Sequence, residues 1–375
     1  MAFISMSSNL ATGVTMPGMS IYLRVPANQA TTLVSANADG ARANAPSVDP
    51  TFASRGRYVV FSSNATNLTS ERTFGKKQIF RKDLVSKQVV LVSVDADGEA
   101  AAGDNAYASV SADGNIIAFT SYAALAPGCT ATHVNIYVRD VARSKTTCLS
   151  VGSNGEEAND GSFQPSISAD GSKVAFRSSA NNLVSGDTNR VDDVFVRDMT
   201  TNTTTLVSVG VDGESANAES TEPSISGDGT RVAFTSNASN LVAGSNHHVE
   251  EIFVRDLAKG KTILASSRDG KTFADGTSVQ PRLSLDGNTV VFMSAATNLT
   301  PQPTNGHRNI YALDLAKKQL RRISVATHGA DLNGDCFQPA VSADGSIVAF
   351  RSNASNLVES DTNLTDDVFV QVALP

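Results

Sequence analysis

The stretch DTNRVDDVFVRD, residues 187–198, brings several oxygen-bearing side chains together. Asp187, Asn189, Asp192 and Asp193 lie within seven residues, ahead of an apolar run. Clustered carboxylate and amide oxygens are the ligands that Ca²⁺ prefers, so the composition suggests a calcium loop. An EF-hand does not fit, because Val191 stands at a ligand position and Asp192 replaces the invariant glycine.

Histidines and carboxylates form a second set of candidates. Histidine carries protons near neutral pH and is a common metal ligand. We predict proton-carrying, catalytic roles for His133, His307 and His328. We predict a divalent ion, Ca or Zn, as cofactor, because such an ion activates bound water. Its candidate ligands are Asp104, Asp160, Glu219, Asp335, His247 and His248.

Composition excludes several other functions. Lys and Arg number 30 against 37 Asp and Glu, which argues against a nucleic-acid partner. No apolar run is long enough to span a bilayer, and the first residues show no signal peptide. The nucleophile elbow G-x-S-x-G, the zinc motif HExxH and glycine-rich phosphate loops are missing. Cys129, Cys148 and Cys336 are odd in number and lack CxxC spacing, which favours unpaired thiols.

A repeat of 57 or 58 residues organises the chain. One aromatic column is Phe3, Phe61, Phe119, Phe176, Phe234, Phe292 and Phe350. A second column is Tyr22, Phe80, Tyr137, Phe195, Phe253, Tyr311 and Phe369. The resulting repeats are 1–45, 46–103, 104–160, 161–218, 219–276, 277–334 and 335–375, which we interpret as a single domain.

Each complete repeat reads as four short strands. Apolar and polar residues alternate, β-branched and aromatic residues are frequent, and helical periodicity is absent. An Asp-Gly pair between the first two strands, such as Asp170-Gly171, suits the positive φ angles of a tight hairpin. Seven such units predict an all-β, seven-bladed β-propeller of four-stranded antiparallel blades, with the seven second-strand phenylalanines buried between blades.

The two end repeats are incomplete. The first begins at its second strand and the last ends with its third, which predicts three strands in each and 26 strands in the chain. We expect the natural precursor to carry further sequence upstream of Met1. An export signal would belong to that segment.

Two hairpins carry a resemblance to a known family. PSISADGSKVAF followed by VFVRD, and PSISGDGTRVAF followed by IFVRD, resemble the repeat of the TolB-like bacterial β-propellers. The resemblance extends over essentially the whole chain. It implies a bacterial protein of the periplasm or a secreted one. It does not fix an activity, because such propellers serve protein docking, carbohydrate binding and several enzyme chemistries.

Comparison between repeats separates architecture from candidate function. An acid or amide stands two residues before the third-strand aromatic in most copies, as Asp193 does, which favours a role in capping the strand by loop amides. The calcium hypothesis then rests on the DTN sequence, found only at residues 187–189 and 361–363. We favour architecture over a metal there.

The aperiodic residues gather in two kinds of loop on one face. These upper loops join second to third strands, or lead from a fourth strand into the next first strand, and they contain all five histidines. Solvated loop histidines are the alternative interpretation. We expect a binding rim at the channel mouth, formed by residues entering the first strands: Asp49, Tyr107, Gln164, Glu222, Gln280 and Gln338. Carboxylates crowded there would require a cation, unless the rim is simply solvated.

Two functional hypotheses follow. The first is a metal-dependent hydrolase acting on a small ester, lactone or phosphoester at the acidic, histidine-bearing face. The second is a non-catalytic module that docks a protein or a cationic peptide on the same face, as the TolB resemblance implies. The histidines favour the enzyme, because a docking surface does not need them.

Overall fold

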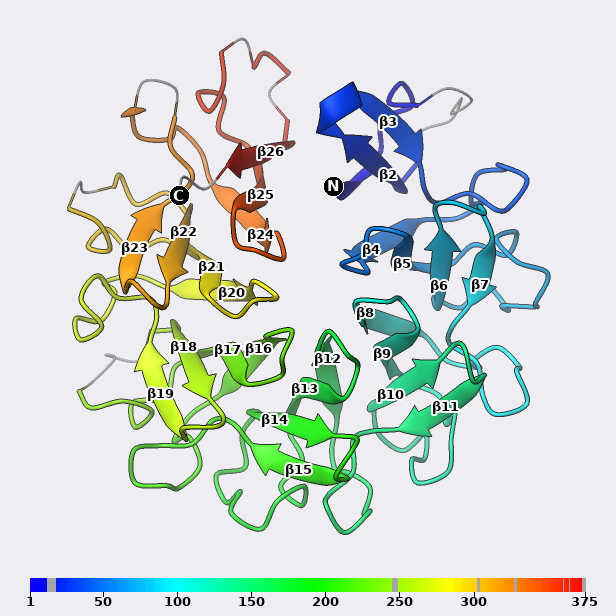
Figure 1. Ribbon diagram of the computed structural model, residues 1–375, viewed down its shortest axis with the longest axis horizontal. Coiled ribbons are helices and arrows are strands. Elements are labelled where there is room, and N and C mark those ends of the chain that lie inside the picture. The colour runs from blue at the N-terminus through cyan, green and yellow to red at the C-terminus, as the bar shows by residue number, and fades with distance from the viewer. Residues whose placement is uncertain are drawn as a thin grey trace. The chain divides into compact units, whose positions relative to one another are not determined.

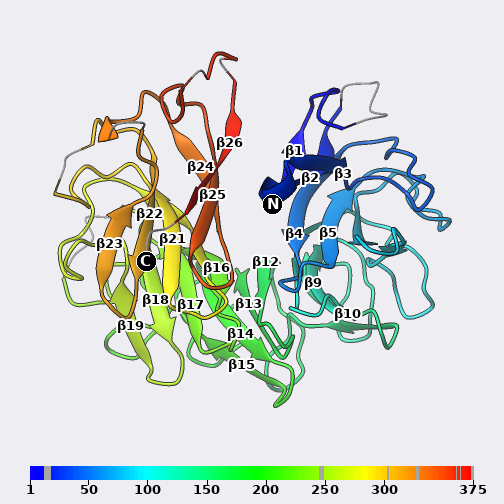
Figure 2. The same cartoon turned by 45° about the horizontal axis from the view of Figure 1, so that its top comes forward.

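Strand pairing confirms the predicted fold. The computed structural model describes residues 1–11, 18–244, 249–301, 304–326, 329–359, 361–363 and 365–372. It is a seven-bladed β-propeller, in which five blades have four antiparallel strands and the first and last have three (Figures 1 and 2). Pro26–Asn28 forms a 3-10 turn, and no helix in the described residues is long and apolar enough to cross a membrane.

The blades follow one another along the chain. Blade 1 contains β1 (Ala2–Ser5), β2 (Ser20–Val25) and β3 (Ala30–Leu33). Blade 2 contains β4 (Ser47–Phe52), β5 (Tyr58–Ser63), β6 (Gln78–Asp83) and β7 (Val89–Leu91). Blade 3 contains β8 (Asn105–Val110), β9 (Ile116–Ser121), β10 (Asn135–Asp140) and β11 (Lys145–Cys148). Blade 4 contains β12 (Ser162–Ile167), β13 (Lys173–Ser178), β14 (Asp193–Asp198) and β15 (Thr203–Leu206).

The remaining blades repeat this order. Blade 5 contains β16 (Ser220–Ile225), β17 (Arg231–Ser236), β18 (Glu251–Asp256) and β19 (Lys261–Leu264). Blade 6 contains β20 (Ser278–Leu283), β21 (Thr289–Ser294), β22 (Asn309–Asp314) and β23 (Gln319–Arg322). Blade 7 contains β24 (Cys336–Val341), β25 (Ile347–Ser352) and β26 (Asp367–Val372).

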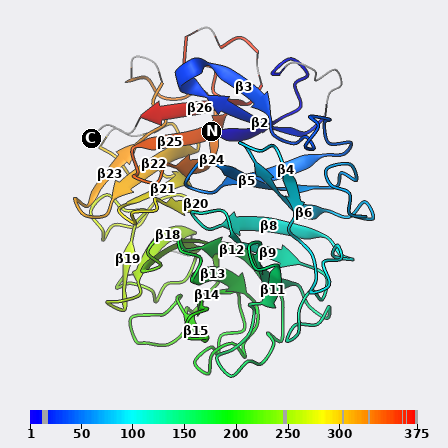
Figure 3. The same cartoon turned by 45° about the vertical axis from the view of Figure 1, so that its right-hand side comes forward.

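Residue contacts divide the chain into two compact units. The first comprises residues 1–184 and 197–204, and the second comprises residues 185–196 and 205–375. In the first unit, β4 lies beside β8 and β8 beside β12, and Figure 3 shows blades 2 and 3 as neighbouring sheets. In the second unit, β16, β20 and β24 lie side by side in the same way.

The two aromatic columns form the core of the blades. Facing rings on the second and third strands stack with centroids 5.9 Å apart in Phe61–Phe80 and 5.8 Å apart in Phe292–Tyr311. Six of the seven second-strand phenylalanines are buried as predicted, whereas Phe3 is only half-buried. Stacked rings of this size supply most of the apolar area that each short strand can bury.

The Asp-Gly turns lie where they were predicted, but only their glycines have positive φ, and the connection is longer than the predicted two-residue hairpin. Gly114, Gly171, Gly229, Gly287 and Gly345 have φ values between 67 and 80°. The aspartate caps the turn, since Asp170 Oδ1 accepts hydrogen bonds from the Ser168 hydroxyl at 2.7 Å and from the Ser172 N–H at 2.9 Å. The Ser168 N–H donates to the Lys173 carbonyl at 2.9 Å, which closes a four-residue loop and fixes the register of the first two strands.

The prediction of three unpaired thiols is wrong for two of them. Cys129 and Cys148 form a disulfide, with their Cα atoms 5.8 Å apart, and only Cys336 is a buried free thiol. Cys129 lies in the loop before β10 and Cys148 ends β11. The antiparallel pairing of those two strands brings together residues that are 19 apart in sequence, and no CxxC spacing reveals this.

Reduction of this disulfide is expected to destabilise the protein. Closing a loop of this length removes about 3 kcal/mol of conformational freedom from the unfolded chain. Dithiothreitol should therefore lower the urea midpoint of the wild type. The urea midpoint of the Cys129→Ser/Cys148→Ser variant should equal that of the reduced wild type and should not change when dithiothreitol is added. An unchanged wild-type midpoint after verified reduction would contradict this.

Candidate functional site

The six residues predicted to form a binding rim share one unusual backbone position. Each lies at a β-bulge in its first strand, where the pairing register with the second strand shifts. Their φ values lie between 52 and 58°, in the left-handed region that non-glycine residues rarely adopt. The residues are Asp49, Tyr107, Gln164, Glu222, Gln280 and Gln338.

In the second unit these bulge side chains connect neighbouring blades. The Gln280 N–H donates to Glu222 Oε2 at 2.7 Å, and the Gln338 N–H donates to Gln280 Oε1 at 2.9 Å. The Thr235 hydroxyl also donates to Glu222 Oε2, at 3.0 Å. Glu222 and Gln280 therefore have an architectural task, whatever they bind.

An arginine beside the bulge was missed in the sequence. Arg282 follows the proline of β20, where the other first strands carry Thr, Ser or Ala. Its guanidinium donates to the Pro281 carbonyl at 2.8 Å. Arg282 is exposed and lies close enough to Glu222 to feel its charge, so the acidic rim has a cation beside it. Arg282 is the only arginine at this position of the repeat, and this departure from the pattern could have identified it as a candidate in the sequence.

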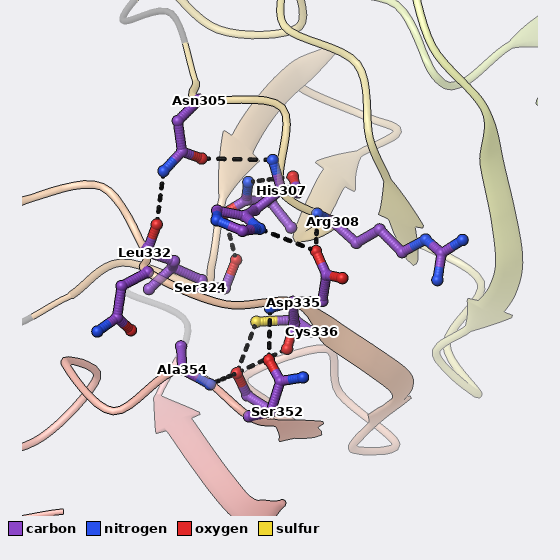
Figure 4. A network of polar contacts seen from close by, with 12 residues as sticks. Asn305, His307, Arg308, Ser324, Leu332, Asp335, Cys336, Ser352 and Ala354 are labelled. Atoms are coloured by element: carbon purple, nitrogen blue, oxygen red, sulfur yellow. Dashed lines mark hydrogen bonds and ion pairs between the residues drawn. The ribbon is translucent and has the colours of Figure 1, made fainter. Parts of the chain in front are cut away.

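Two predicted site residues, His307 and Asp335, come together in the second unit. His307 lies in the loop between β21 and β22, and Asp335 immediately precedes β24. His307 Nδ1 and Asp335 Oδ1 are 3.2 Å apart, which leaves His307 Nε2 outside this contact (Figure 4). The two side chains are 39% and 34% exposed, so small molecules in solvent can reach them. We call this pair the dyad.

A backbone hydrogen bond that also occurs in another blade holds the aspartate of the dyad. The Arg308 N–H donates to Asp335 Oδ1 at 2.9 Å, and the Lys77 N–H donates to Asp104 Oδ1 at 2.8 Å in the corresponding loops of the first unit. Gly334 lets the chain approach β25 closely, because a Cβ there would lie 2.8 Å from the Ala354 nitrogen. The backbone contact of Asp335 is therefore architecture, and the histidine contact is the aperiodic addition.

Arg308 directly follows His307 in the chain, and Phe337 stands two residues after Asp335. The guanidinium of Arg308 is 5.8 Å from the centroid of Phe337, and that of Arg351 is 5.0 Å from it. Arg351 Nε also pairs with Asp366 Oδ2 at 3.4 Å. Sequence reasoning missed these arginines, although Arg351 and Phe337 each belong to columns in which Arg or Phe occurs in only one other copy, at Arg177 and Phe163.

The other predicted ligands do not assemble into a metal centre among the described residues. His133 is half-buried, and its ring makes no hydrogen bond there. Asp160 and Glu219 are exposed. His247, His248 and His328 lie outside the described residues. Within the described ranges, no three His, Cys, Asp or Glu side chains are arranged to hold a metal ion, so we derive no chemical step through one.

The acid or amide column is architectural, as predicted, but its main partner is a different one. In five blades a serine hydroxyl at the exit of the fourth strand donates to this side chain, an arrangement that we call the latch. The distances are 2.5 Å for Ser93 to Gln78, 2.6 Å for Ser150 to Asn135, 2.5 Å for Ser208 to Asp193 and 3.0 Å for Ser324 to Asn309, and Ser266 donates likewise to Glu251. Loop amides contribute only in places, such as Ala274 N–H to Glu251 Oε1 at 2.7 Å.

Two latches are ionisable and fully buried. Burial raises the pKa of Glu251 to about 8. Burial, together with the charges of Asp187 and Asp192, raises the pKa of Asp193 to about 7. Both groups hold a proton more readily than ordinary carboxylates do, because the protein interior disfavours the charged form.

Comparisons with known proteins agree on the fold. No protein-family model and no curated protein sequence matches the chain. The β-propeller domain of the trilobed protease from Pyrococcus furiosus is 10% identical with a TM-score of 0.58, over 99% of this chain and 91% of that one. Oligogalacturonate lyase in complex with manganese is 12% identical with a TM-score of 0.53, over 96% and 84%.

A TolB-type propeller is also similar. The putative TolB from Agrobacterium tumefaciens is 14% identical with a TM-score of 0.50, over 95% of this chain and 98% of that one. At these identities the similarity shows the fold alone, a seven-bladed β-propeller. The same architecture occurs in enzymes and in other proteins, so function must be argued from the site.

Proposed function

We propose that the protein is a hydrolase that cleaves a small ester, lactone or phosphoester at the upper loops around the dyad. The contact between His307 Nδ1 and Asp335 Oδ1 carries this proposal. An aspartate that accepts the Nδ1 proton leaves Nε2 basic and stabilises the imidazolium that forms. His307 Nε2 then removes a proton from the attacking water and returns it to the leaving oxygen.

The surrounding charges favour an anionic substrate. Arg308 and Arg351 place two guanidinium groups beside Phe337, and Arg308 and Phe337 are close in sequence to His307 and Asp335 respectively. Guanidinium groups match the geometry of carboxylate and phosphate oxygens, and an aromatic face adds apolar contact. Among the three substrate classes, this supports the phosphoester, or an ester that carries a carboxylate.

A docking module is the second candidate. Arginine and aromatic side chains are enriched in protein interfaces, so Arg308, Phe337 and Arg351 also suit a protein or peptide partner. The similarity to a putative TolB is compatible with a docking module. The similarity to an oligogalacturonate lyase in complex with manganese is compatible with an enzyme that binds a metal ion. A Ca or Zn cofactor therefore stays part of the proposal, to be tested with a chelator.

We also propose that the protein is bacterial and that it is located in the periplasm or secreted. The Cys129–Cys148 disulfide supports it, because disulfides persist in the periplasm and outside the cell.

A substrate panel tests the hydrolase. Purified protein is assayed with 4-nitrophenyl esters, lactones, and phosphate mono- and diesters, before and after treatment with EDTA. We expect turnover of at least one class, with a preference for anionic substrates. Loss of turnover with EDTA and recovery with Ca²⁺ or Zn²⁺ would support the cofactor. Absence of any turnover above that of His307→Gln would exclude the hydrolase and leave the docking module.

A further inference from the structure

Asp187 is a buried carboxylate in an exposed loop. Its neighbours Gly186 and Thr188 are exposed, whereas Asp187 itself is only 6% exposed. The backbone N–H of Asn189 donates to its carboxylate, but Asp187 Oδ1 is buried and has no hydrogen-bond partner. An unpaired carboxylate oxygen is costly to bury, so it requires a proton or a cation.

A second carboxylate lies close to it. Asp193 is fully buried, and its two oxygens accept from the Ser208 hydroxyl at 2.5 Å and the Asn189 amide at 2.6 Å. The charge of Asp187 is near enough to contribute to the raised pKa of Asp193. Neither carboxylate forms an ion pair with a described Lys, Arg or His, so no side chain of that part of the protein neutralises them.

Two other blades have no carboxylate at the position of Asp187. In blades 2 and 6 the buried residue is a threonine, and the hydroxyls of Thr73 and Thr304 donate at 3.3 Å to the loop carbonyls of Ala65 and Ala296. A carboxylate cannot donate in this way unless it is protonated.

The second DTN sequence provides an internal comparison. Asn363 donates to Asp367 at 2.7 Å, and the Thr365 N–H donates to Asn363 at 3.0 Å, as Asn189 does to Asp193 and the Val191 N–H does to Asn189. Asp361, however, is only half-buried, so water can solvate its carboxylate. The local fold of the loop thus does not require a buried aspartate. The unpartnered oxygen is particular to Asp187.

We propose that Asp187 Oδ1 binds a calcium ion in the loop before β14, with Asp193 supplying a second negative charge. Oxygen is the only donor type that the described part of this loop offers, and Ca²⁺ accepts carboxylates, backbone carbonyls and water together. The site is separate from the dyad and does not depend on the proposed hydrolysis. It revises our preference for a purely architectural role of the DTN sequence.

Calcium titration of the full chain tests this site. Protein stripped with EDTA and desalted is titrated with CaCl₂ by calorimetry, and its melting temperature is measured with and without CaCl₂. We expect wild type to bind calcium and to melt at a higher temperature with it. Asp187→Asn should bind roughly 100-fold more weakly, because one substitution removes both a ligand and its charge. Without calcium it should melt no lower than wild type.

Three further variants separate the possible outcomes. Asp361→Asn and His307→Gln should keep the calcium response of the wild type. Asparagine is the natural residue at this latch position in two other blades, as Asn135 and Asn309, so the Asp193→Asn variant should fold. It should bind calcium more weakly than the wild type. Calcium uptake that is unaffected by Asp187→Asn, no uptake by the wild type at millimolar CaCl₂, or an equal response to MgCl₂ would each overturn the proposal.

Discussion

His307→Gln is expected to lower kcat by about 10²- to 10⁴-fold with little change in KM, because general acid–base catalysis typically contributes that much. Glutamine keeps the length and polarity of the side chain but cannot carry the proton. Asp335→Asn should also lower kcat, since asparagine no longer holds the Nδ1 proton of His307. Asp335 acts through the histidine, so it is a positioning residue. The measurement is steady-state kinetics on the best substrate of the panel.

Asp104→Asn is the matched control for the dyad. Asp104 accepts the Lys77 N–H at 2.8 Å, as Asp335 accepts the Arg308 N–H at 2.9 Å, but no histidine contact accompanies it. Asn at either position can still accept that backbone bond. Equal losses of kcat in Asp104→Asn and Asp335→Asn would show that the dyad has no special role in turnover.

Glu251→Gln is expected to remove much of the pH dependence of stability. Burial raises the pKa of Glu251 from 4.5 to about 8 in the folded protein. The folded state therefore binds a proton that the unfolded state releases, and wild-type stability falls as pH rises through that interval and levels off above it. Each pKa unit corresponds to about 1.4 kcal/mol, so the titration of Glu251 alone should cost the wild type roughly 4 kcal/mol between about pH 5 and about pH 8.5.

The slope with pH, rather than the absolute stability, carries this prediction. Gln78 occupies the same position in blade 2, so glutamine is compatible with a latch, but the amide introduced by Glu251→Gln has a single oxygen and would lose the hydrogen bond from Ala274 N–H. That loss costs about 1 kcal/mol at every pH. Urea unfolding at several pH values measures the slope. Glu214→Gln, at an exposed carboxylate, is the control, and a variant slope as steep as that of the wild type would contradict the prediction.

The fold was predictable because its signals repeat. A strand boundary that is ambiguous in one copy is clear from the others, and the aromatic columns and the Asp-Gly turns together identify three strands in five of the seven repeats. The three-stranded end blades also followed from the register of the copies. The prediction that Phe3 is buried was wrong, because a repeating aromatic position does not indicate how much of an end blade is covered by neighbouring residues.

The site was only partly predictable, because its contacts do not repeat. His307 and Asp335 were both candidates, but their pairing depends on two loops that are distant in sequence and meet beside β25. Arg308, Arg351 and Arg282 were missed, since arginines in alternating strands look like solvated residues until their neighbours are known. The Cys129–Cys148 disulfide was missed because its partners meet through strand pairing.

In blades 2 to 6 the latch reduces the demands on the loop between the second and third strands. It requires only an acceptor at the start of the third strand and a serine after the fourth, and Gln, Asn, Asp and Glu all meet that requirement here. In these five blades the start of the third strand is thus held independently of most of the loop sequence. A loop grafted from one latched repeat onto another should fold if it keeps the buried residues of the segment, such as Ala180 and Leu183, so the five latched blades form a scaffold for recombining binding segments.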